Sequence, residues 1–225
     1  MKDLITIGLP SKGRLKDKAI SFFDDRGFKI LQSEKERNYF GTIKNENNIK
    51  IIFLHAKEII QRLGDGTLDI GVSGLDLLKE SDKNLQNKIS VQKKLDFGNA
   101  NLVIAVPDDW IDVQTIADLE EVSFDIRYKR NSRLRVATKY PNLTNNFLIS
   151  KGVTQYKLII SLGATETYPF IGSSEIITDI TSTGKTLADN NLRVLKDGLI
   201  LCSNACLFIA KKKAAKLQPF LKSFD

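Results

Sequence analysis

The sequence predicts an α/β fold made of two lobes. Three observations support this fold: short apolar runs alternate with segments of helical spacing, a long β-rich run interrupts the alternation, and the alternation then restarts. Alternation of this kind is typical of a parallel sheet covered by helices. A length of 225 residues is enough for one large domain or two smaller ones.

The first half of the chain carries three strand–helix pairs. Apolar runs that predict buried strands occupy residues 4–9, 49–54 and 68–74. Segments with helical spacing follow them at residues 15–27, 56–66 and 75–80. Glycine ends the first two of these segments, as it commonly does at the C-terminus of a helix.

The second half repeats the pattern between two long β-rich runs. Three strand–helix pairs are predicted at 134–140 with 142–152, 156–161 with 164–172, and 175–180 with 184–191. The β-rich runs, at about 89–106 and 194–210, would be the strands that cross between the lobes. We therefore expect lobe I to comprise residues 1–95 and 195–225 and lobe II to comprise residues 96–194. A single continuous lobe is the alternative.

The charge balance favours anionic partners. The net charge is +7, from 34 basic and 27 acidic residues. Only one dense basic run occurs, "IRYKRNSRLR" at 126–135, and it lacks the aromatic interleaving of a base-stacking surface. We interpret it as a solvated loop and expect no nucleic acid partner. No apolar run is long enough to span a bilayer, so we expect a cytoplasmic protein without a membrane partner.

Few soft ligands are present. Cys202 and Cys206 are the only cysteines, and His55 is the only histidine. We expect both cysteines to be buried core residues on one strand face, without a disulfide. A structural zinc site is close to excluded, and no protein-held metal site is predicted. The chemistry must come from carboxylates, cations, hydroxyls, backbone amides and a bound hard metal.

One loop carries the strongest chemical signal. In "IITDITSTGKTL", residues 176–187, a predicted strand leads into a predicted helix through Thr181, Ser182, Thr183, Gly184, Lys185 and Thr186. Hydroxyls, a glycine and a lysine at this place suit one phosphate monoester, although a simple helix cap is the alternative. Asp179 stands where a P-loop needs glycine, and its carboxylate would repel the phosphates that a P-loop wraps. A carboxylate there could instead accept hydrogen bonds from sugar hydroxyls.

Other predicted strand ends carry charged residues. Lys12 and Arg14 flank Gly13 in "LPSKGRL", which indicates a second anion site. "LDIGVSGLDLL", residues 68–78, is expected to place Asp69 and Asp76 around one turn. Two further strand ends bear hydroxyl and charged side chains, namely Thr138, Lys139, Glu166 and Thr167.

The pattern D-x-x-x-T-G-x-T at 179–186 resembles the phosphoribosyl-pyrophosphate loop of phosphoribosyltransferases. Six segments, "LPSKGRL", "ERNYFG", "GDGTLDIGVSGLDLL", "LRVATKYPNL", "GATETYP" and "TDITSTGKTLADNNL", resemble ATP phosphoribosyltransferase in order and spacing. The length is similar to the short form, which lacks a C-terminal regulatory domain. Two departures from the family pattern are Glu175, in place of an aspartate, and His55, in place of an arginine.

The resemblance implies a fold and a reaction. It implies two lobes of periplasmic-binding-protein-like (type II) topology with the active site in the cleft between them. The implied reaction transfers phosphoribose to N1 of ATP, releases pyrophosphate with the help of Mg²⁺, and begins histidine biosynthesis. The implied partner is a regulatory subunit that resembles histidyl-tRNA synthetase, in a hetero-octamer.

The resemblance also implies roles for individual residues. Asp179 through Leu187 would bind phosphoribosyl pyrophosphate, while Lys12, Arg14 and Arg37 would be catalytic cations, Arg37 on the departing pyrophosphate. Gly13, Asp76 and Glu166 are assigned to ATP. The two carboxylates would be positioning groups, because N1 of adenine carries no proton to remove; loop or cap carboxylates are the alternative. The rival functions are a non-catalytic small-anion binder and, more remotely, a P-loop hydrolase.

Overall fold

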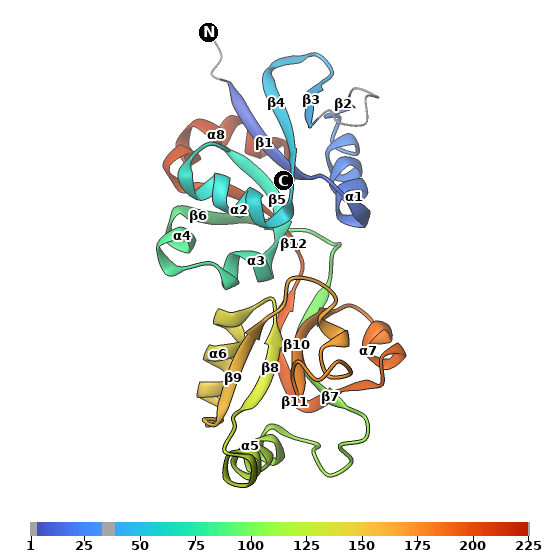
Figure 1. Cartoon of the computed structure of the whole chain (residues 1–225). Helices are drawn as coiled ribbons and strands as arrows, with labels where there is room; N and C mark the ends of the chain where they lie inside the picture. Colours follow the sequence, from blue (N-terminus) through green and yellow to red (C-terminus); the bar gives the residue numbers. More distant parts are fainter. Residues whose placement is uncertain (1–3, 33–38, 225) are drawn as a thin grey trace. The chain divides into compact units, whose positions relative to one another are not determined.

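The computed structural model describes residues 4–32 and 39–224. The chain divides into two compact units: unit 1 is Met1–Gly98 with Asn204–Asp225, and unit 2 is Asn99–Ser203. Each unit is a β-sheet with helices on both faces (Figure 1). The α/β fold class with two units is therefore confirmed.

Unit 1 contains a mixed sheet with the strand order β2-β3-β4-β1-β5-β12-β6. Its strands are β1 (Ile5–Pro10), β2 (Ile30–Gln32), β3 (Phe40–Ile43), β4 (Glu46–Leu54), β5 (Ile70–Gly74), β6 (Ile89–Lys94) and β12 (Ala205–Ala210). The three central strands β4, β1 and β5 are parallel, as predicted. The flanking strands, for which the sequence predicted no orientation, pair antiparallel and make the sheet mixed.

Helices cover both faces of the unit 1 sheet. They are α1 (Gly13–Asp24), α2 (Ala56–Asp65), α3 (Leu75–Glu80), α4 (Lys83–Lys88) and α8 (Ala214–Leu221). One core places α1 and α8 against β1 and β4, with Phe23 and Leu217 fully buried. The other core places α2 against β5 and β12, with Ile59 and Phe208 fully buried. Helix α2 ends at Gly66, whose φ of +84° is the left-handed conformation that glycine adopts without strain.

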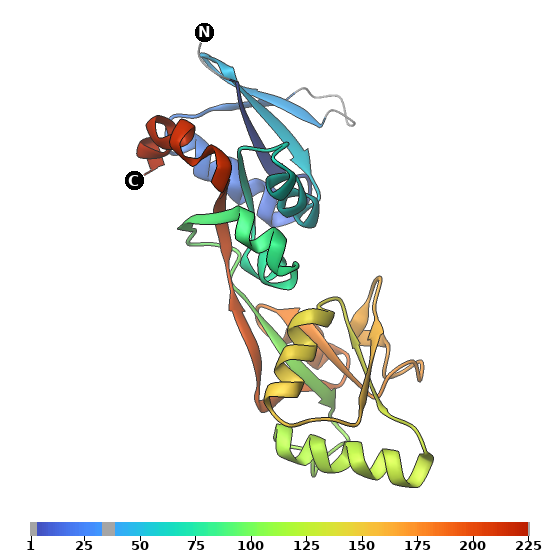
Figure 2. The same cartoon turned by 90° about the vertical axis from the view of Figure 1, so that its left-hand side faces the viewer.

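Unit 2 contains a smaller mixed sheet with the order β11-β7-β10-β8-β9. Its strands are β7 (Ala100–Pro107), β8 (Leu134–Thr138), β9 (Tyr156–Ile160), β10 (Ile176–Thr181) and β11 (Leu192–Ser203). Strands β10, β8 and β9 are parallel, so their carboxyl ends meet at one edge. Helices α5 (Ile116–Arg130) and α6 (Pro141–Ser150) pack on one face (Figure 2), and α7 (Lys185–Asp189) packs on the other (Figure 1).

Three sequence-based interpretations need correction. Residues 126–130 form the last turn of α5 rather than a loop, because a Thr115–Asp118 capping box starts this helix and its basic last turn suits the negative helix end. Residues 164–172 contain only a 3₁₀ turn, Thr165–Thr167; Pro169 follows it and has no N–H with which to continue the helical hydrogen bonds. Cys202 is exposed on β11, whereas Cys206 is buried on β12.

Both long β-rich runs are divided between the two sheets. The first run splits into β6 and β7, and the second splits into β11 and β12. The chain returns to unit 1 after Ser203, later than the expected residue 195, because β11 stays paired with β7 as far as Ser203 opposite Ala100.

Candidate functional site

The predicted phosphate loop connects β10 to α7. Gly184 has a φ of +76°, and its N–H donates to Thr181 Oγ1 at 2.9 Å. The Lys185 N–H donates to Thr183 Oγ1 at 3.3 Å. Since both threonine hydroxyls accept a bond from the backbone, each keeps its own proton to donate to a bound anion. The loop is therefore folded by the same hydroxyls that would bind phosphate.

Most of the loop is open to solvent. Ser182, Thr183, Lys185 and Thr186 are exposed. The Ser182 hydroxyl donates to the Asn99 carbonyl at 3.1 Å, which ties the loop to the start of β7. These features give a preordered bend with accessible hydroxyl and ammonium donors, as a phosphate monoester requires.

Asp179 lies on β10 just before this loop. Its side chain is partly buried, and its Oδ1 accepts the N–H of Ile180 at 2.8 Å. Burial raises the pKa of the Asp179 carboxyl above its ordinary value, and the negative charge of Glu166 adds to the rise. The Ile180 hydrogen bond and the positive charge of Lys139 oppose it. Among the described residues no cation forms an ion pair with Asp179, so its carboxylate can accept hydrogen bonds from a ligand.

Glu166 lies near Asp179 rather than in a separate site. It belongs to the 3₁₀ turn that follows β9, and this turn contacts β10. The hydroxyls of Ser161 and Thr165 share a hydrogen bond of 2.9 Å that fixes the turn. Unit 2 thus brings Asp179, the loop and Glu166 together at the carboxyl edge of its parallel strands.

The second predicted anion site lies at the carboxyl end of β1 in unit 1. Lys12 is the N-cap residue of α1, and Gly13 follows with a φ of +69°. Lys12 and Arg14 are both exposed. The Ser11 N–H donates to the Leu54 carbonyl at 2.9 Å, which holds this turn against the end of β4. Two accessible cations at a helix start suit an anionic ligand.

Asp76 lies at the carboxyl end of β5, the neighbour of β1. Its side chain is buried, in the first turn of α3. A Cβ at Gly74 would approach Asp76 Oδ1 to 2.3 Å, so the carboxylate needs glycine at that position. Arg37, the remaining predicted cation, lies outside the described residues.

Asp69 does not share the turn of Asp76, contrary to the sequence-based expectation. It precedes β5, whereas Asp76 follows it. Its Oδ2 accepts the N–H and the hydroxyl of Thr6, at 2.7 and 2.8 Å, and its Oδ1 lies 2.7 Å from Lys213 Nζ. Burial acts to raise the pKa of Asp69, but the bonds from Lys213 and Thr6 outweigh it and lower that pKa. Asp69 is a structural residue that ties the C-terminal segment to the sheet.

The two departures from the family pattern have local structural roles. His55 is the N-cap of α2, and its Nδ1 accepts the N–H of Lys57 at 3.3 Å. Glu175 binds the Arg135 guanidinium, with Oε1 at 2.6 Å from Nη2, and its Oε2 accepts the Arg135 N–H at 2.7 Å. Burial alone would raise the pKa of Glu175, but Arg135 lowers it. Both residues are therefore engaged within the protein.

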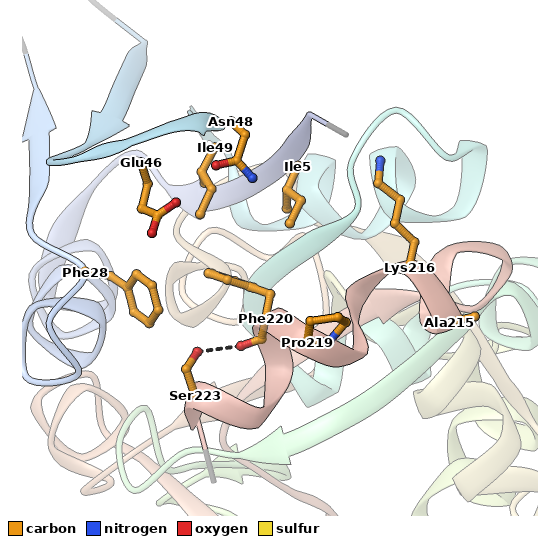
Figure 3. Close-up of a pocket in the computed structure, with 10 residues that line it drawn as sticks. All are labelled: Ile5, Phe28, Glu46, Asn48, Ile49, Ala215, Lys216, Pro219, Phe220 and Ser223. Atoms are coloured by element: carbon orange, nitrogen blue, oxygen red, sulfur yellow. Dashed lines mark hydrogen bonds between the residues drawn. The ribbon is translucent and has the colours of Figure 1, made fainter. Parts of the chain in front are cut away.

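A pocket of about 710 Å³ in unit 1 lies away from the predicted anion site of that unit. Ile5 and Ile49, at the amino end of β1 and its partner on β4, form one wall, and Phe28 and Phe220 form another (Figure 3). The predicted anion site is at the opposite end of β1. This pocket therefore takes no part in the anion site of unit 1.

The structure adds one residue to the predicted set. Lys139 follows β8, and its charge acts on Asp179. The sequence places Lys139 at a strand end, but only the pairing of β8 with β10 reveals that it is next to Asp179.

No group of three or more His, Cys, Asp or Glu side chains that could hold a metal ion occurs in the part of the chain that the structure describes. Within residues 4–32 and 39–224, no helix combines the length and apolar character that crossing a bilayer requires.

The chain is similar in sequence to known ATP phosphoribosyltransferases. The sequence profile of the ATP phosphoribosyltransferase family matches residues 55–224. ATP phosphoribosyltransferase of Brucella melitensis is 45% identical over 209 residues, covering 92% of this chain and 90% of the relative.

The structural comparisons support the predicted fold. The ATP phosphoribosyltransferase (HisG:HisZ) complex of Thermotoga maritima has a chain with a TM-score of 0.74 and 24% identity, covering 98% of this chain and 96% of that one. The extracellular-binding protein YtmK of an amino-acid transporter from Bacillus subtilis has a TM-score of 0.53 and 12% identity, covering 100% and 90%. The expected periplasmic-binding-protein-like topology is thereby confirmed, and the sequence matches show that the chain belongs to the ATP phosphoribosyltransferase family.

Proposed function

We propose that this chain transfers the 5-phosphoribosyl group of phosphoribosyl pyrophosphate to N1 of ATP, the first step of histidine biosynthesis. In this pentosyl transfer the C1–O bond to pyrophosphate breaks, a C1–N1 bond forms, and pyrophosphate leaves with the bonding electrons. The observation that carries the proposal is the partly buried Asp179 carboxylate, which forms no ion pair among the described residues, next to an ordered, hydroxyl-lined loop in a chain of this family.

The loop and Asp179 would bind different parts of the sugar donor. Thr181, Ser182, Thr183, Gly184, Lys185 and Thr186 would bind the 5′-phosphate through hydroxyls, backbone N–H groups and one ammonium. Asp179 would accept hydrogen bonds from the ribose hydroxyls. Binding at both ends of the ribose fixes the direction in which C1 faces, and such orientation accounts for much of the rate gain in a two-substrate reaction.

Cations would stabilise the charge that grows on the leaving pyrophosphate. We assign Lys12, Arg14 and Arg37 to this role, with Gly13 and Asp76 on ATP. Fixed cations at the place where negative charge develops lower the barrier by several kcal/mol. Glu166 was assigned to ATP from the sequence, but its position beside Asp179 supports a role near the ribose instead.

The residues present fit a magnesium ion whose ligands come largely from the substrates. Mg²⁺ commonly takes one or two carboxylates together with phosphate oxygens and water. Asp179 and Glu166 offer two hard oxygen ligands, without a third in the described residues. When bound, Mg²⁺ would neutralise diphosphate oxygens and hold them in one geometry.

A regulatory partner is part of the proposal. The Thermotoga maritima neighbour is a HisG:HisZ complex. We propose that this chain also works with a regulatory subunit resembling histidyl-tRNA synthetase, in a hetero-octamer. The cytoplasmic location expected from the sequence stays a prediction.

The test is an assay of pyrophosphate release from ATP, Mg²⁺ and phosphoribosyl pyrophosphate, with and without that partner. We expect release only when both substrates are present, and Arg37→Ala should lower turnover strongly. Binding of either substrate without pyrophosphate release, even with the partner, would favour a non-catalytic anion binder. Phosphate release from ATP alone would favour a hydrolase.

A further inference from the structure

A pocket of about 660 Å³ lies in unit 2, at the edge of the sheet opposite the loop at residues 181–186. Arg135, Ser174 and Glu175 line it near the amino ends of β8 and β10. Strand β7 runs antiparallel to β10, so Pro107 at its carboxyl end lies at the same edge. The pocket is therefore separate from the candidate site of unit 2, which lies at the other end of β10.

A buried hydroxyl in this pocket lacks a partner. The Ser174 side chain is 2% exposed, and its Oγ forms no hydrogen bond with the described residues. A hydroxyl that is removed from water without a partner costs folding stability, and buried polar groups in native proteins nearly always have one. Because Ser174 lines the pocket, a molecule bound there would supply the missing hydrogen bond.

Two arginines offer N–H donors to the same pocket. Arg130, the last residue of α5, is exposed and forms no ion pair within the described part of the chain. Arg135 donates from Nε and Nη2 to Glu175 and from Nη1 to the Gly172 carbonyl. A guanidinium has five N–H donors, so these three bonds leave Arg135 two. Free guanidinium donors suit a carboxylate, which accepts two of them at once.

The rest of the lining is largely apolar. Two proline rings and two aromatic rings contribute to it, from Pro107, Pro169, Trp110 and Phe170. Phe170 is 58% exposed although it is a large apolar side chain. Trp110 is partly buried and is the only tryptophan of the chain. Rings of this kind pack against a flat apolar body, so the ligand needs an apolar part beside its polar group.

The charges of the lining limit the charge of the ligand. Asp108 and Asp109 also line the pocket, and both are exposed. With Glu175 they set three carboxylates against two guanidinium groups, a net charge of −1. This balance repels a phosphate dianion more than a single carboxylate. An amine would be attracted, but an ammonium has no acceptor for the arginine donors. A monocarboxylate fits both requirements.

We propose that this pocket binds a small monocarboxylate with an apolar or aromatic body. Its carboxylate accepts from Arg130 and from the Ser174 hydroxyl, and its body packs against Trp110 and Phe170. The site does not depend on the proposed transfer reaction, because none of the residues that line it was assigned to either substrate.

The test uses the fluorescence of Trp110, which reports on this pocket because the chain has no other tryptophan. Phenylacetate, titrated into the full chain, should change the emission with a Kd of about 1 mM, as expected for a ligand of this size. Benzylamine and phenyl phosphate carry a similar ring on a cation and on a dianion, and we expect both to bind about tenfold more weakly. No saturable change with phenylacetate, or tighter binding of either analogue, would overturn the inference.

Three variants test the assigned contacts. Arg130→Gln should weaken phenylacetate binding about tenfold and Ser174→Ala about fivefold, because each removes a hydrogen-bond donor. Arg133→Gln removes an exposed arginine that does not line the pocket, and it should bind phenylacetate normally. Unchanged affinity in Arg130→Gln or in Ser174→Ala would overturn the inference.

Urea unfolding separates a lost contact from a damaged fold. The free energy of unfolding should not fall in Ser174→Ala, because alanine removes a buried hydroxyl that has no partner in the free chain. A fall would show that the protein itself satisfies this hydroxyl, and would overturn its assignment to a ligand. The fluorescence readout needs no turnover, so an inactive chain would reject the proposed transfer reaction without affecting this test.

Discussion

Asp69 and Asp179 are two partly or fully buried aspartates with opposite environments. Asp69 accepts two bonds from Thr6 and lies 2.7 Å from Lys213 Nζ, and its pKa is lowered. Asp179 accepts a protein hydrogen bond from the next residue in the chain, and its pKa is raised. The first carboxylate is held by two hydrogen bonds and a cation of the protein, whereas the second forms no ion pair among the described residues.

This difference separates a structural acid from a binding acid. Burying a carboxylate is costly unless hydrogen bonds and a cation compensate for the lost water. Unit 1 supplies that compensation to Asp69 with groups from β1 and the C-terminal segment. Unit 2 compensates the buried charge of Asp179 only in part. A carboxylate in such a place costs folding stability, and perturbed acids of this kind are typical of functional sites.

The largest effect is expected from Asp179→Asn. Loss of the charged acceptor should lower kcat/KM for phosphoribosyl pyrophosphate by about 100-fold, as removal of one charge-stabilising group commonly does. Thermal stability should not fall, because the amide removes an unpaired, partly buried charge. Asp109→Asn, an exposed aspartate of the same unit, is the control. Full activity in Asp179→Asn would remove this residue from the site.

Lys213→Met tests the structural role of Asp69, and we expect it to lower stability rather than activity. It leaves the Asp69 charge buried without its cation, so the free energy of unfolding at pH 7 should fall by about 2–3 kcal/mol. Because the folded pKa of Asp69 lies below 3.8, the stability from this ion pair is present above that value and is lost as the pH falls through the folded pKa. The difference from the unsubstituted chain should therefore shrink in acid.

Urea unfolding at several pH values measures this difference, with the exposed Lys212→Met as the control. The kcat/KM of the folded enzyme should stay unchanged in Lys213→Met. A loss of activity without a loss of stability would contradict the structural role of Asp69.

Gly184→Ala tests the loop next to Asp179. No atom lies within 4 Å of the added Cβ, so the effect is one of backbone conformation at a φ of +76°. The left-handed conformation costs alanine about 1 kcal/mol, and we expect KM for phosphoribosyl pyrophosphate to rise about fivefold as the loop relaxes. Gly152→Ala has a similar φ of +83° and equally open surroundings, but it lies after α6. An equal change in KM in both variants would argue against a role for the loop.

Glu175→Gln is expected to give the smallest effect. It weakens the pairing with Arg135, which is partly exposed, so the free energy of unfolding should fall by about 1 kcal/mol. Activity should be unchanged, because the residue supports β8 and β10 at their amino ends. Denaturant unfolding of Glu175→Gln measures the change in the free energy of unfolding, with the exposed Glu121→Gln as the control. A selective loss of activity would place Glu175 in the site.

Features carried by contiguous residues were predictable from the sequence. The loop from Asp179 to Thr186 is such a feature, because its strand, hydroxyls, glycine and helix start follow one another in the chain. The parallel core strands were predictable for the same reason, since short apolar runs define them. Helix α5 was missed although Thr115 and Asp118 form a capping box, because the basic run at its end was interpreted as a loop.

Features that depend on pairing were not predictable. Lys213 is far from Asp69 in the sequence, and nothing local indicates that they form an ion pair. The position of Lys139 beside Asp179 depends on the register of β8 against β10, which a single sequence does not specify. The roles of both aspartates therefore became clear only from their neighbours in space.

A crystal structure of the chain with phosphoribosyl pyrophosphate and Mg²⁺ tests the central claim most directly. We predict that the 5′-phosphate contacts residues 181–186 and that a ribose hydroxyl donates to the Asp179 carboxylate. A donor bound elsewhere, with Asp179 and this loop free of it, would contradict the account.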